Sequence, residues 1–182
     1  LVAHVRASAY PHLLRVWNYL DAITAGAGDD ERYRQFCVGR FAGLADYLGQ
    51  FPAATAIGRR DGRRVLQVYW LAAREPGAAI ENPRQLAAYC YPRQHGPQPP
   101  SFARAMLAAP ALRMPLMLSG TAAVVGHASR HADDLPAQLQ ESFYNFDALI
   151  TQAQAHVGLE QRPGAEMACQ PRFVRLRLGD QR

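Results

Sequence analysis

A proline-rich stretch between about residues 75 and 115 contains the side chains best suited to binding a small ligand. Eight of the 13 prolines fall there, together with Tyr91, Arg93, His95 and Arg104. Aromatic rings stack on planar ligands, and arginine side chains form paired hydrogen bonds with carboxylates. A long irregular segment with such side chains is typical of an ordered functional loop. We therefore predict a site for a small, ring-containing anion; a strap that only covers the surface is the alternative.

Other groupings of chemically active residues predict no site. His127 and His131 are four residues apart but lie beside Gly126, and no carboxylate completes a metal site. Ser119 lacks the glycine pattern of a nucleophilic serine turn. Cys37 lies on the apolar side of an expected helix, which is typical of a core thiol. Because the three cysteines have no CxxC spacing, we predict neither a zinc site nor a disulfide framework.

The charge distribution argues against a nucleic-acid partner. All 20 basic residues are arginine, which excludes lysine Schiff-base chemistry and a Walker-type phosphate loop. Residues 169–182 hold four arginines and one acid, so +3 of the net charge of +5 lies there and +2 on the other 168 residues. A nucleic-acid binder carries its basic residues on the folded surface. No apolar run approaches the roughly 18 residues of a membrane span, and no signal peptide opens the chain. We expect no membrane partner and a cytoplasmic location.

Hydrophobic spacing predicts several elements before the proline-rich stretch. Residues 13–23 fit either a helix or a strand. A helix is expected over residues 31–48, capped by Asp29 or Asp30. Two β-type runs, 53–57 and 65–71, flank the dipeptide Asp61-Gly62, which predicts a hairpin between them.

The proline-rich stretch is predicted to hold neither a regular helix nor a central strand. Short strands are expected beyond it at 116–118 and 122–125. Asp133 or Asp134 then caps a helix that ends at Gly158. The predicted buried face of this helix comprises Leu135, Leu139, Phe143, Phe146 and Ile150. This order of elements indicates an α+β fold of two half-similar units.

Longer motifs, taken in order and spacing, resemble one known family. They span residues 11–158 and include RVWNYL (15–20), ERYRQFCVGR (31–40), IENPRQ (80–85), YPRQHG (91–96), PSFAR (100–104) and SGTAAVVGH (119–127). In these motifs the chain is similar to the chorismatases.

The resemblance implies a fold of RidA (YjgF)-type units, like the small chorismate-mutase barrels. Such units have a mixed β-sheet with helices packed on one face, and the likeness assigns residues 15–20 to a strand. We expect residues 1–75 to be the C-terminal part of a first unit and 76–115 a connecting loop. Residues 116–168 would begin an incomplete second unit, and 169–182 would be a tail outside the family.

The resemblance also implies an activity, the release of the enolpyruvyl group of chorismate as pyruvate. The other product would be a 3- or 4-hydroxybenzoate or a dihydroxycyclohexadiene carboxylate. Chorismate carries two carboxylates, for which Arg93 and Arg104 are the expected partners, with Arg40 as a third cation. The remaining expected contacts to chorismate, or to a related small aromatic or cyclohexadiene carboxylate, come from Tyr91, His95, Gly120 and Thr121. No cofactor is implied.

The sequence departs from the family where the catalytic residues are expected. The family's general acid is a glutamate in the final strand, seven residues after a cysteine. Here the residue seven after Cys169 is Leu176, which cannot donate a proton. We therefore assign no catalytic residue, and we interpret the chain as a truncated or frame-shifted fragment that is inactive by itself. Glu81, inside a family motif, is interpreted as a structural partner of Asn82 and Arg84.

A second function class stays open. A RidA-like module could bind a small molecule or hydrolyse an enamine or imine, with Ser119, Gly120 and an arginine holding a carboxylate. In both cases we expect a homo-oligomer, either a trimer or an assembly with exchanged elements. The reason is that an incomplete unit leaves a sheet edge and an apolar helix face uncovered.

Overall fold

A computed structural model of the chain describes residues 1–45 and 50–160. The predicted tail at 169–182 lies outside the described residues, as does the predicted second unit beyond residue 160. The helices and strands run in the order α1 (Val2–Arg6), β1 (His12–Asp21), η1 (Gly28–Asp30), α2 (Arg32–Gly43), β2 (Ala53–Arg59), β3 (Leu66–Ala73), β4 (Ala78–Ile80), η3 (Ala88–Cys90), η4 (Arg93–His95), β5 (Ala105–Leu107), η5 (Pro110–Leu112), β6 (Met117–Leu118), β7 (Val124–Val125), β8 (Ala128–Ser129) and α3 (Leu135–Glu160), where η marks a short 3-10 helix.

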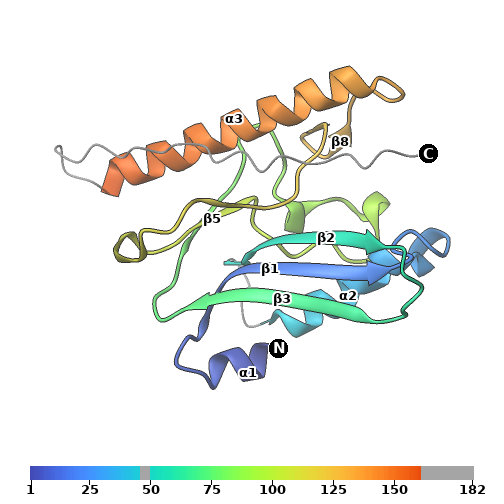
Figure 1. Cartoon of the computed structure of the whole chain (residues 1–182). Helices are drawn as coiled ribbons and strands as arrows, with labels where there is room; N and C mark the ends of the chain where they lie inside the picture. The colour runs from blue at the N-terminus through green and yellow to red at the C-terminus, as the bar shows by residue number, and fades with distance from the viewer. Residues whose placement is uncertain (46–49, 161–182) are drawn as a thin grey trace.

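The first sheet has the order β2-β1-β3, with β1 in the centre (Figure 1). β1 pairs in parallel with β2 and antiparallel with β3. Leu14 and Val16 of this strand are 1% and 0% exposed, because a central strand is covered on its edges by its neighbours and on its faces by packed elements. The strand expected at residues 15–20 is therefore confirmed.

The hairpin predicted across Asp61-Gly62 is wrong. β2 and β3 do not pair with each other, because β1 lies between them and pairs with both. The connection between β2 and β3 therefore passes over the end of β1. Gly62 has φ +71°, so the dipeptide does form a local turn. A turn signal reports local backbone geometry, whereas strand partners are set by the burial that the apolar β1 requires.

A second sheet has the order β4-β5-β6 and takes two of its strands, β4 and β5, from the proline-rich stretch. No central strand was predicted in this stretch. That prediction is wrong at β5, which pairs with β4 and with β6. The three residues of β5 contain no proline, so their backbone N–H groups remain available. The strand expected at 116–118 appears as β6. Gly126, with φ +60°, turns the chain between β7 and β8.

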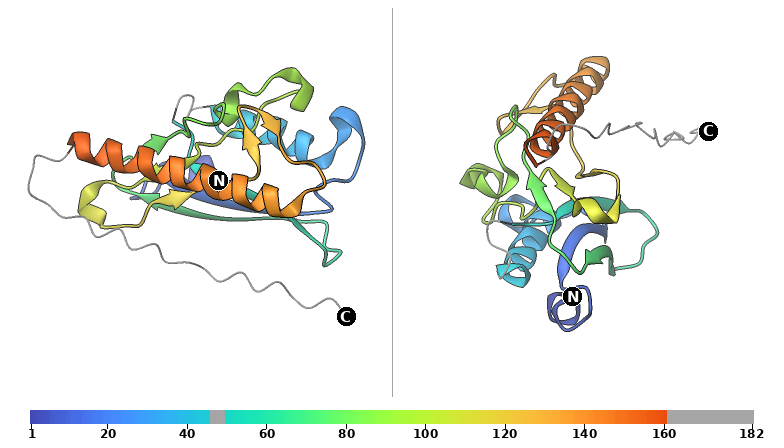
Figure 2. Two further views of the ribbon diagram at one scale, coloured as in Figure 1. Left: turned by 90° about the horizontal axis from the view of Figure 1, so that it is seen from above. Right: turned by 90° about the vertical axis from the view of Figure 1, so that its left-hand side faces the viewer.

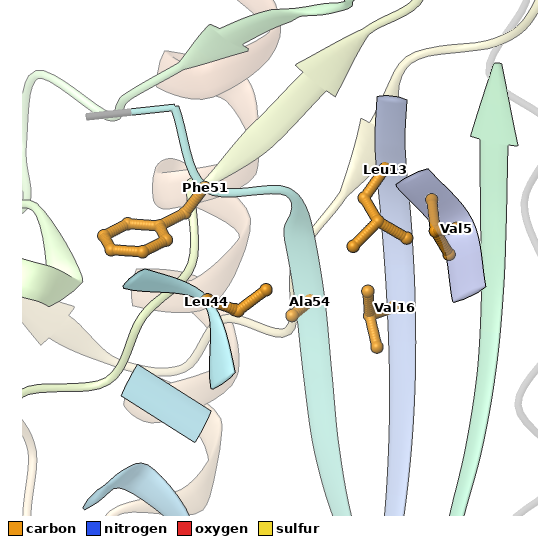
Figure 3. Close-up of a cluster of buried hydrophobic side chains, with 6 residues drawn as sticks. All are labelled: Val5, Leu13, Val16, Leu44, Phe51 and Ala54. Atoms are coloured by element: carbon orange, nitrogen blue, oxygen red, sulfur yellow. The ribbon is translucent and has the colours of Figure 1, made fainter. Parts of the chain in front are cut away.

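α2 contributes to the largest apolar cluster (Figure 3). It ends at Gly43, before the predicted boundary at 48, and residues 46–49 lie outside the described ranges. The N-cap is Glu31, without a side-chain cap bond, rather than Asp29 or Asp30. Cys37 is 2% exposed, which confirms the core thiol. The cluster joins α1, β1, β2 and the end of α2 through Val5, Leu13, Val16, Leu44, Phe51 and Ala54.

α3 lies on the opposite side of the second sheet from the first sheet (Figures 1 and 2). Asp134 caps it as predicted, since Ala137 N donates to Asp134 Oδ1 at 3.0 Å. The helix continues past the predicted stop at Gly158 to Glu160.

The predicted buried face of α3 is wrong. Leu135, Leu139 and Phe143 are 66%, 52% and 53% exposed, whereas Asn145, Leu149 and Ala153 are 0%, 2% and 4% exposed. The Asn145 amide fixes the rotation of the helix, because it donates to two backbone oxygens, Ala122 O and Val124 O, each at 2.9 Å. Hydrophobic spacing alone favours the more apolar face of the helix and does not detect the hydrogen bonds of Asn145.

The two sheets are joined by the hydroxyl of Ser119, which is 3% exposed. It accepts a hydrogen bond from Ala54 N at 2.8 Å and donates one to Ala103 O. We expect Ser119→Ala to lower the free energy of unfolding by about 1–2 kcal/mol, because it leaves two buried backbone groups unpaired. Urea unfolding would measure the change, with Ser129→Ala on the exposed end of β8 as the control. Equal unfolding midpoints for the two variants would contradict this role.

Candidate anion-binding site

A cavity of about 440 Å3 lies where the first sheet, α2 and the loops around residues 100–104 and 120–124 meet. Aromatic and aliphatic side chains form part of its wall, and polar groups interrupt them. The residues that line this cavity include Asn18, Glu31, Tyr33, Phe36, Cys37, Arg40, Thr55, Gln85, Phe102, Arg104, Gly120, Thr121 and Val124. This volume fits a single-ring ligand.

Arg40 projects from the last turn of α2 into this cavity. Its Nε donates to Ser101 O at 3.1 Å, while its Nη2 is buried without a hydrogen-bond partner. Burial lowers the pKa of the guanidinium from its ordinary value to about 10. A buried donor that lacks a partner is costly, so an incoming acceptor at this position would be favoured.

Arg104 lies at the start of β5 and is 5% exposed. Its Nη2 donates to Leu86 O and to the Tyr91 hydroxyl, both at 2.8 Å. Its guanidinium lies 5.3 Å and 5.6 Å from the ring centres of Phe102 and Tyr91. Its Nε is buried without a partner. Tyr91 therefore holds Arg104 and does not itself line the cavity.

Gly120 and Thr121 line the cavity opposite these arginines. Gly120 N donates to Thr55 Oγ1 at 3.2 Å, and Gln85 Nε2 donates to Thr121 Oγ1 at 3.3 Å. A Cβ at Gly120 would lie 3.4 Å from Thr55 Cγ2, at van der Waals contact with the cavity wall. Gln85 Oε1 is buried and has no partner.

Besides Tyr91, two further residues predicted for the site lie outside the cavity wall. Arg93 is paired with Asp29 at the surface, its side chain 66% exposed, and this pairing lowers the pKa of Asp29. His95 lies beside Tyr91, with ring centres 5.1 Å apart, and its Nε2 is 3.1 Å from His127 Nδ1. Their roles in ligand binding stay predictions. The structure thus brings together Arg40, Arg104, Gly120 and Thr121.

Sequence reasoning missed two contributors. Arg15 is 5% exposed inside β1 and donates to Val16 O and to Thr55 Oγ1. Burial lowers its pKa to about 10, and the charge of Arg40 adds to the effect. Gln85 was quoted only as part of a motif. An arginine within an otherwise apolar strand was the signal that could have identified Arg15.

Arg40 and Arg104 line the cavity, and Arg15 contacts Thr55 of the cavity wall. Over residues 1–45 and 50–160, the recorded salt bridges include none of them. An uncompensated buried charge costs several kcal/mol. Glu31 also lines the cavity, but it is paired with Arg34 at 3.2 Å. The electrostatics favour an anionic ligand.

The other candidate residues are occupied elsewhere. Both Ser119 hydroxyl bonds go to backbone groups, so Ser119 is not free for the carboxylate that the RidA-like alternative required. His131 contacts Glu141, and His127 contacts His95, so these two histidines do not converge. Among the described residues, no group of three His, Cys, Asp or Glu side chains could hold a metal ion. Burial raises the pKa of Cys37 to about 11, which keeps the thiol protonated.

Glu81 is not the partner of Arg84 that the sequence predicted. Arg84 is paired with Glu141 of α3, and its backbone N–H contacts Asn82. Both carboxylate oxygens of Glu81 are buried without a hydrogen bond of regular geometry. Burial raises the pKa of Glu81 from 4.5 to about 7, while the positive charge and the backbone N–H of Arg104 act in the opposite direction.

This raised pKa makes stability depend on pH. The folded chain binds the Glu81 proton more tightly than the unfolded chain, so the stabilisation is complete below about pH 4.5 and is lost as pH rises through about 7. We expect Glu81→Gln to unfold with a free energy about 1–2 kcal/mol higher than the wild type at pH 8. Urea unfolding from pH 4 to 8 tests this, with Glu75→Gln as the exposed control. A Glu81→Gln profile parallel to the wild type would disprove it.

The fold and the site together define a class: an α+β protein with an arginine-lined cavity suited to a small anion. Residues 1–72 match the family model described as chorismatase FkbO/Hyg5-like, N-terminal. The chain is 40% identical over 151 residues to a 3-hydroxybenzoate synthase of Streptomyces hygroscopicus, covering 78% of this chain and 44% of the relative. It is 42% identical over 149 residues to a chorismatase of Streptomyces rapamycinicus, with the same coverages. The chain is therefore a homologue of the chorismatases.

The fold gives the same result. A solved chorismatase structure superposes with a TM-score of 0.77 and 36% identity, covering 85% of this chain and 48% of that chain. The predicted α+β class and the predicted resemblance to the chorismatases are confirmed. The chain spans less than half the length of the curated relatives it matches. None of the helices in the described ranges has the length and hydropathy to span a membrane.

Proposed function

We propose that this chain provides the substrate-binding cavity of a chorismatase, whose whole protein releases pyruvate from chorismate and leaves a hydroxybenzoate or a dihydroxycyclohexadiene carboxylate. The observation that carries the proposal is that the half-buried Arg40 and the buried Arg104 each have a buried N–H without an acceptor. Similarity to proteins named chorismatase and 3-hydroxybenzoate synthase supports the choice of ligand.

The chemistry of chorismate matches the cavity. Its two carboxylates need two cationic partners, and Arg40 and Arg104 come from different elements that meet at the same space. Its ring needs apolar surface, which Phe36 and Phe102 offer. Its hydroxyl group needs a hydrogen-bond partner, and the unpartnered Gln85 Oε1 is a suitable acceptor. Arg104 is held by Tyr91 before the ligand arrives, so little ordering is required on binding.

Titration calorimetry with matched ligands tests this proposal. We expect chorismate and 3-hydroxybenzoate to bind, and 3-hydroxybenzamide, which has the same ring but no charge, to bind at least about tenfold more weakly, because a charge-assisted hydrogen bond contributes at least 1.4 kcal/mol. Equal affinity for the acid and the amide would show that the arginines do not recognise a carboxylate.

We also propose that the chain assembles with further copies of itself, as a trimer or with exchanged elements. Support comes from the exposed stripe on α3 formed by Leu135, Leu139 and Phe143. A contiguous apolar face of this kind is typical of an interaction surface. Light scattering is expected to give a multiple of the chain mass. The double variant Leu139→Glu, Phe143→Glu should shift it to the mass of one chain. A wild type of single-chain mass at about 100 μM, well above the micromolar range of weak pairs, would contradict self-association.

A further inference from the structure

Glu81 and Arg104 form a pair of buried polar groups beside the cavity. Ile80 at the end of β4 pairs with Ala105 of β5 in an antiparallel register, so the next step places Glu81 opposite Arg104. Neither oxygen of the Glu81 carboxylate has a hydrogen bond of regular geometry, and Arg104 Nε has none either. Only Arg104 lines the cavity. A ligand can therefore contact the cation of this pair without contacting the carboxylate.

The charges around Glu81 come from few elements. Arg104 faces it from the neighbouring strand. Burial and the charge of Glu81 raise the pKa of Tyr89 in η3. On α3, Glu141 is paired with Arg84 and His131. Arg104 is thus the main cation that favours the ionised form of Glu81. The His95–His127 pair packs against Tyr91.

A ligand carboxylate on Arg104 would remove this support. Arg104 would then be compensated by the ligand, and Glu81 would be a second negative charge in a buried region with one fewer available cation. Placing two anions against one buried cation is unfavourable, and protonation of the carboxylate that is the stronger base relieves it. The ligand carboxylate stays ionised because it receives the guanidinium hydrogen bonds directly. The proton must therefore go to Glu81.

We propose that binding of a carboxylate ligand to Arg104 is coupled to uptake of one proton from solvent by Glu81. The proton bonds to a carboxylate oxygen of Glu81, so the added ligand charge is offset and the net charge of the buried region does not change. Glu81 is then a positioning residue that sets the charge available at Arg104, without contact with the ligand. This inference rests on the proposed function, in which Arg104 receives the carboxylate.

The coupling has a measurable size. Because the pKa of Glu81 in the free chain is about 7, we expect an uptake of about half a proton per ligand at pH 7 and close to one at pH 8, falling toward zero at pH 5. The affinity of the wild type for 3-hydroxybenzoate should accordingly fall by up to about tenfold per pH unit above pH 7. Glu81→Gln carries no titrating group, so its affinity should be constant over this range and higher than that of the wild type at pH 8.

The test is titration calorimetry of the whole chain with 3-hydroxybenzoate at pH 7.5, in phosphate and in Tris, whose ionisation enthalpies differ. The slope of binding enthalpy against buffer ionisation enthalpy gives the number of protons taken up. We expect a slope of half to one proton for the wild type and for Glu75→Gln, the exposed control, and none for Glu81→Gln. Glu81→Asp, which keeps the carboxyl group, should restore part of the slope.

Two outcomes would overturn the inference in different ways. Binding with the same enthalpy in both buffers, or a slope that Glu81→Gln leaves unchanged, would remove Glu81 from the coupling while leaving the proposed function intact. The absence of binding heat at all pH values and in both buffers would reject the proposed function, and this inference with it.

Discussion

Replacing Arg104 by alanine is expected to weaken binding of 3-hydroxybenzoate by about 2–5 kcal/mol, which is roughly 30- to several-thousandfold in Kd. The guanidinium is 5% exposed and held by Leu86 O and the Tyr91 hydroxyl, so its orientation is fixed before the ligand binds. Its truncation would leave the ligand carboxylate in a desolvated cavity with one cation fewer. Titration calorimetry at pH 6, where Glu81 is mostly protonated, measures the effect without the coupled proton.

Matched variants separate this effect from general loss of charge. Arg104→Lys keeps the charge but cannot form two parallel hydrogen bonds, so we expect it to recover only part of the affinity. Arg93→Ala removes an arginine whose charge is already paired with Asp29 at the surface, so its effect should be smaller than that of Arg104→Ala. If Arg93→Ala weakened binding as much as Arg104→Ala, the carboxylate would have to lie outside the cavity, near Asp29.

The sequence was most informative where local pattern and burial agree. The helix after Asp30 and the cap at Asp134 depend on contacts within a few residues, and both appear in the structure. Hydrophobic spacing left residues 15–20 ambiguous, and only the family resemblance assigned them to a strand, whose partners lie at residues 53–59 and 66–73. The hairpin at Asp61-Gly62 depends on which strands lie side by side, and no turn residue carries that information. Long-range placement was the part that local pattern could not provide.

The residues of the candidate site also fall into those that the sequence predicted and those that only the fold shows. Arg104 was predicted from its residue type, Gly120 and Thr121 were predicted from the family resemblance, and all three line the cavity. Arg93 has the same residue type, but its surface contact with Asp29 depends on where η1 and η4 meet. Arg15 was overlooked because a strand position was assigned to it before its burial was known. Residue type predicted the chemistry of the site, and only the fold determined which arginines provide it.

The position of the carboxyl groups relative to the cavity decides whether this chain can complete the reaction. Removing the enolpyruvyl group requires a proton on a carbon atom, so a protonated acid must be held against the ligand. Among the described residues that line the cavity, the only carboxyl group is Glu31, which is occupied by its ion pair with Arg34. Glu81 holds a proton more readily but does not line the cavity. We therefore expect the 182-residue chain to bind chorismate without releasing pyruvate at an ordinary enzymatic rate.

The expected loss of pyruvate-release rate is large. Loss of a general acid lowers a rate by about a hundred- to ten-thousandfold, which a coupled assay for pyruvate resolves easily. The control is calorimetry on the same preparation, because bound 3-hydroxybenzoate shows that the cavity is intact while turnover is absent. Pyruvate release at an ordinary rate that Glu81→Gln abolishes would identify Glu81 as the proton donor. Such a result would require the Glu81 carboxyl group to rotate into the cavity. It would contradict the positioning role of Glu81, and it would also contradict the absence of a proton donor at the site.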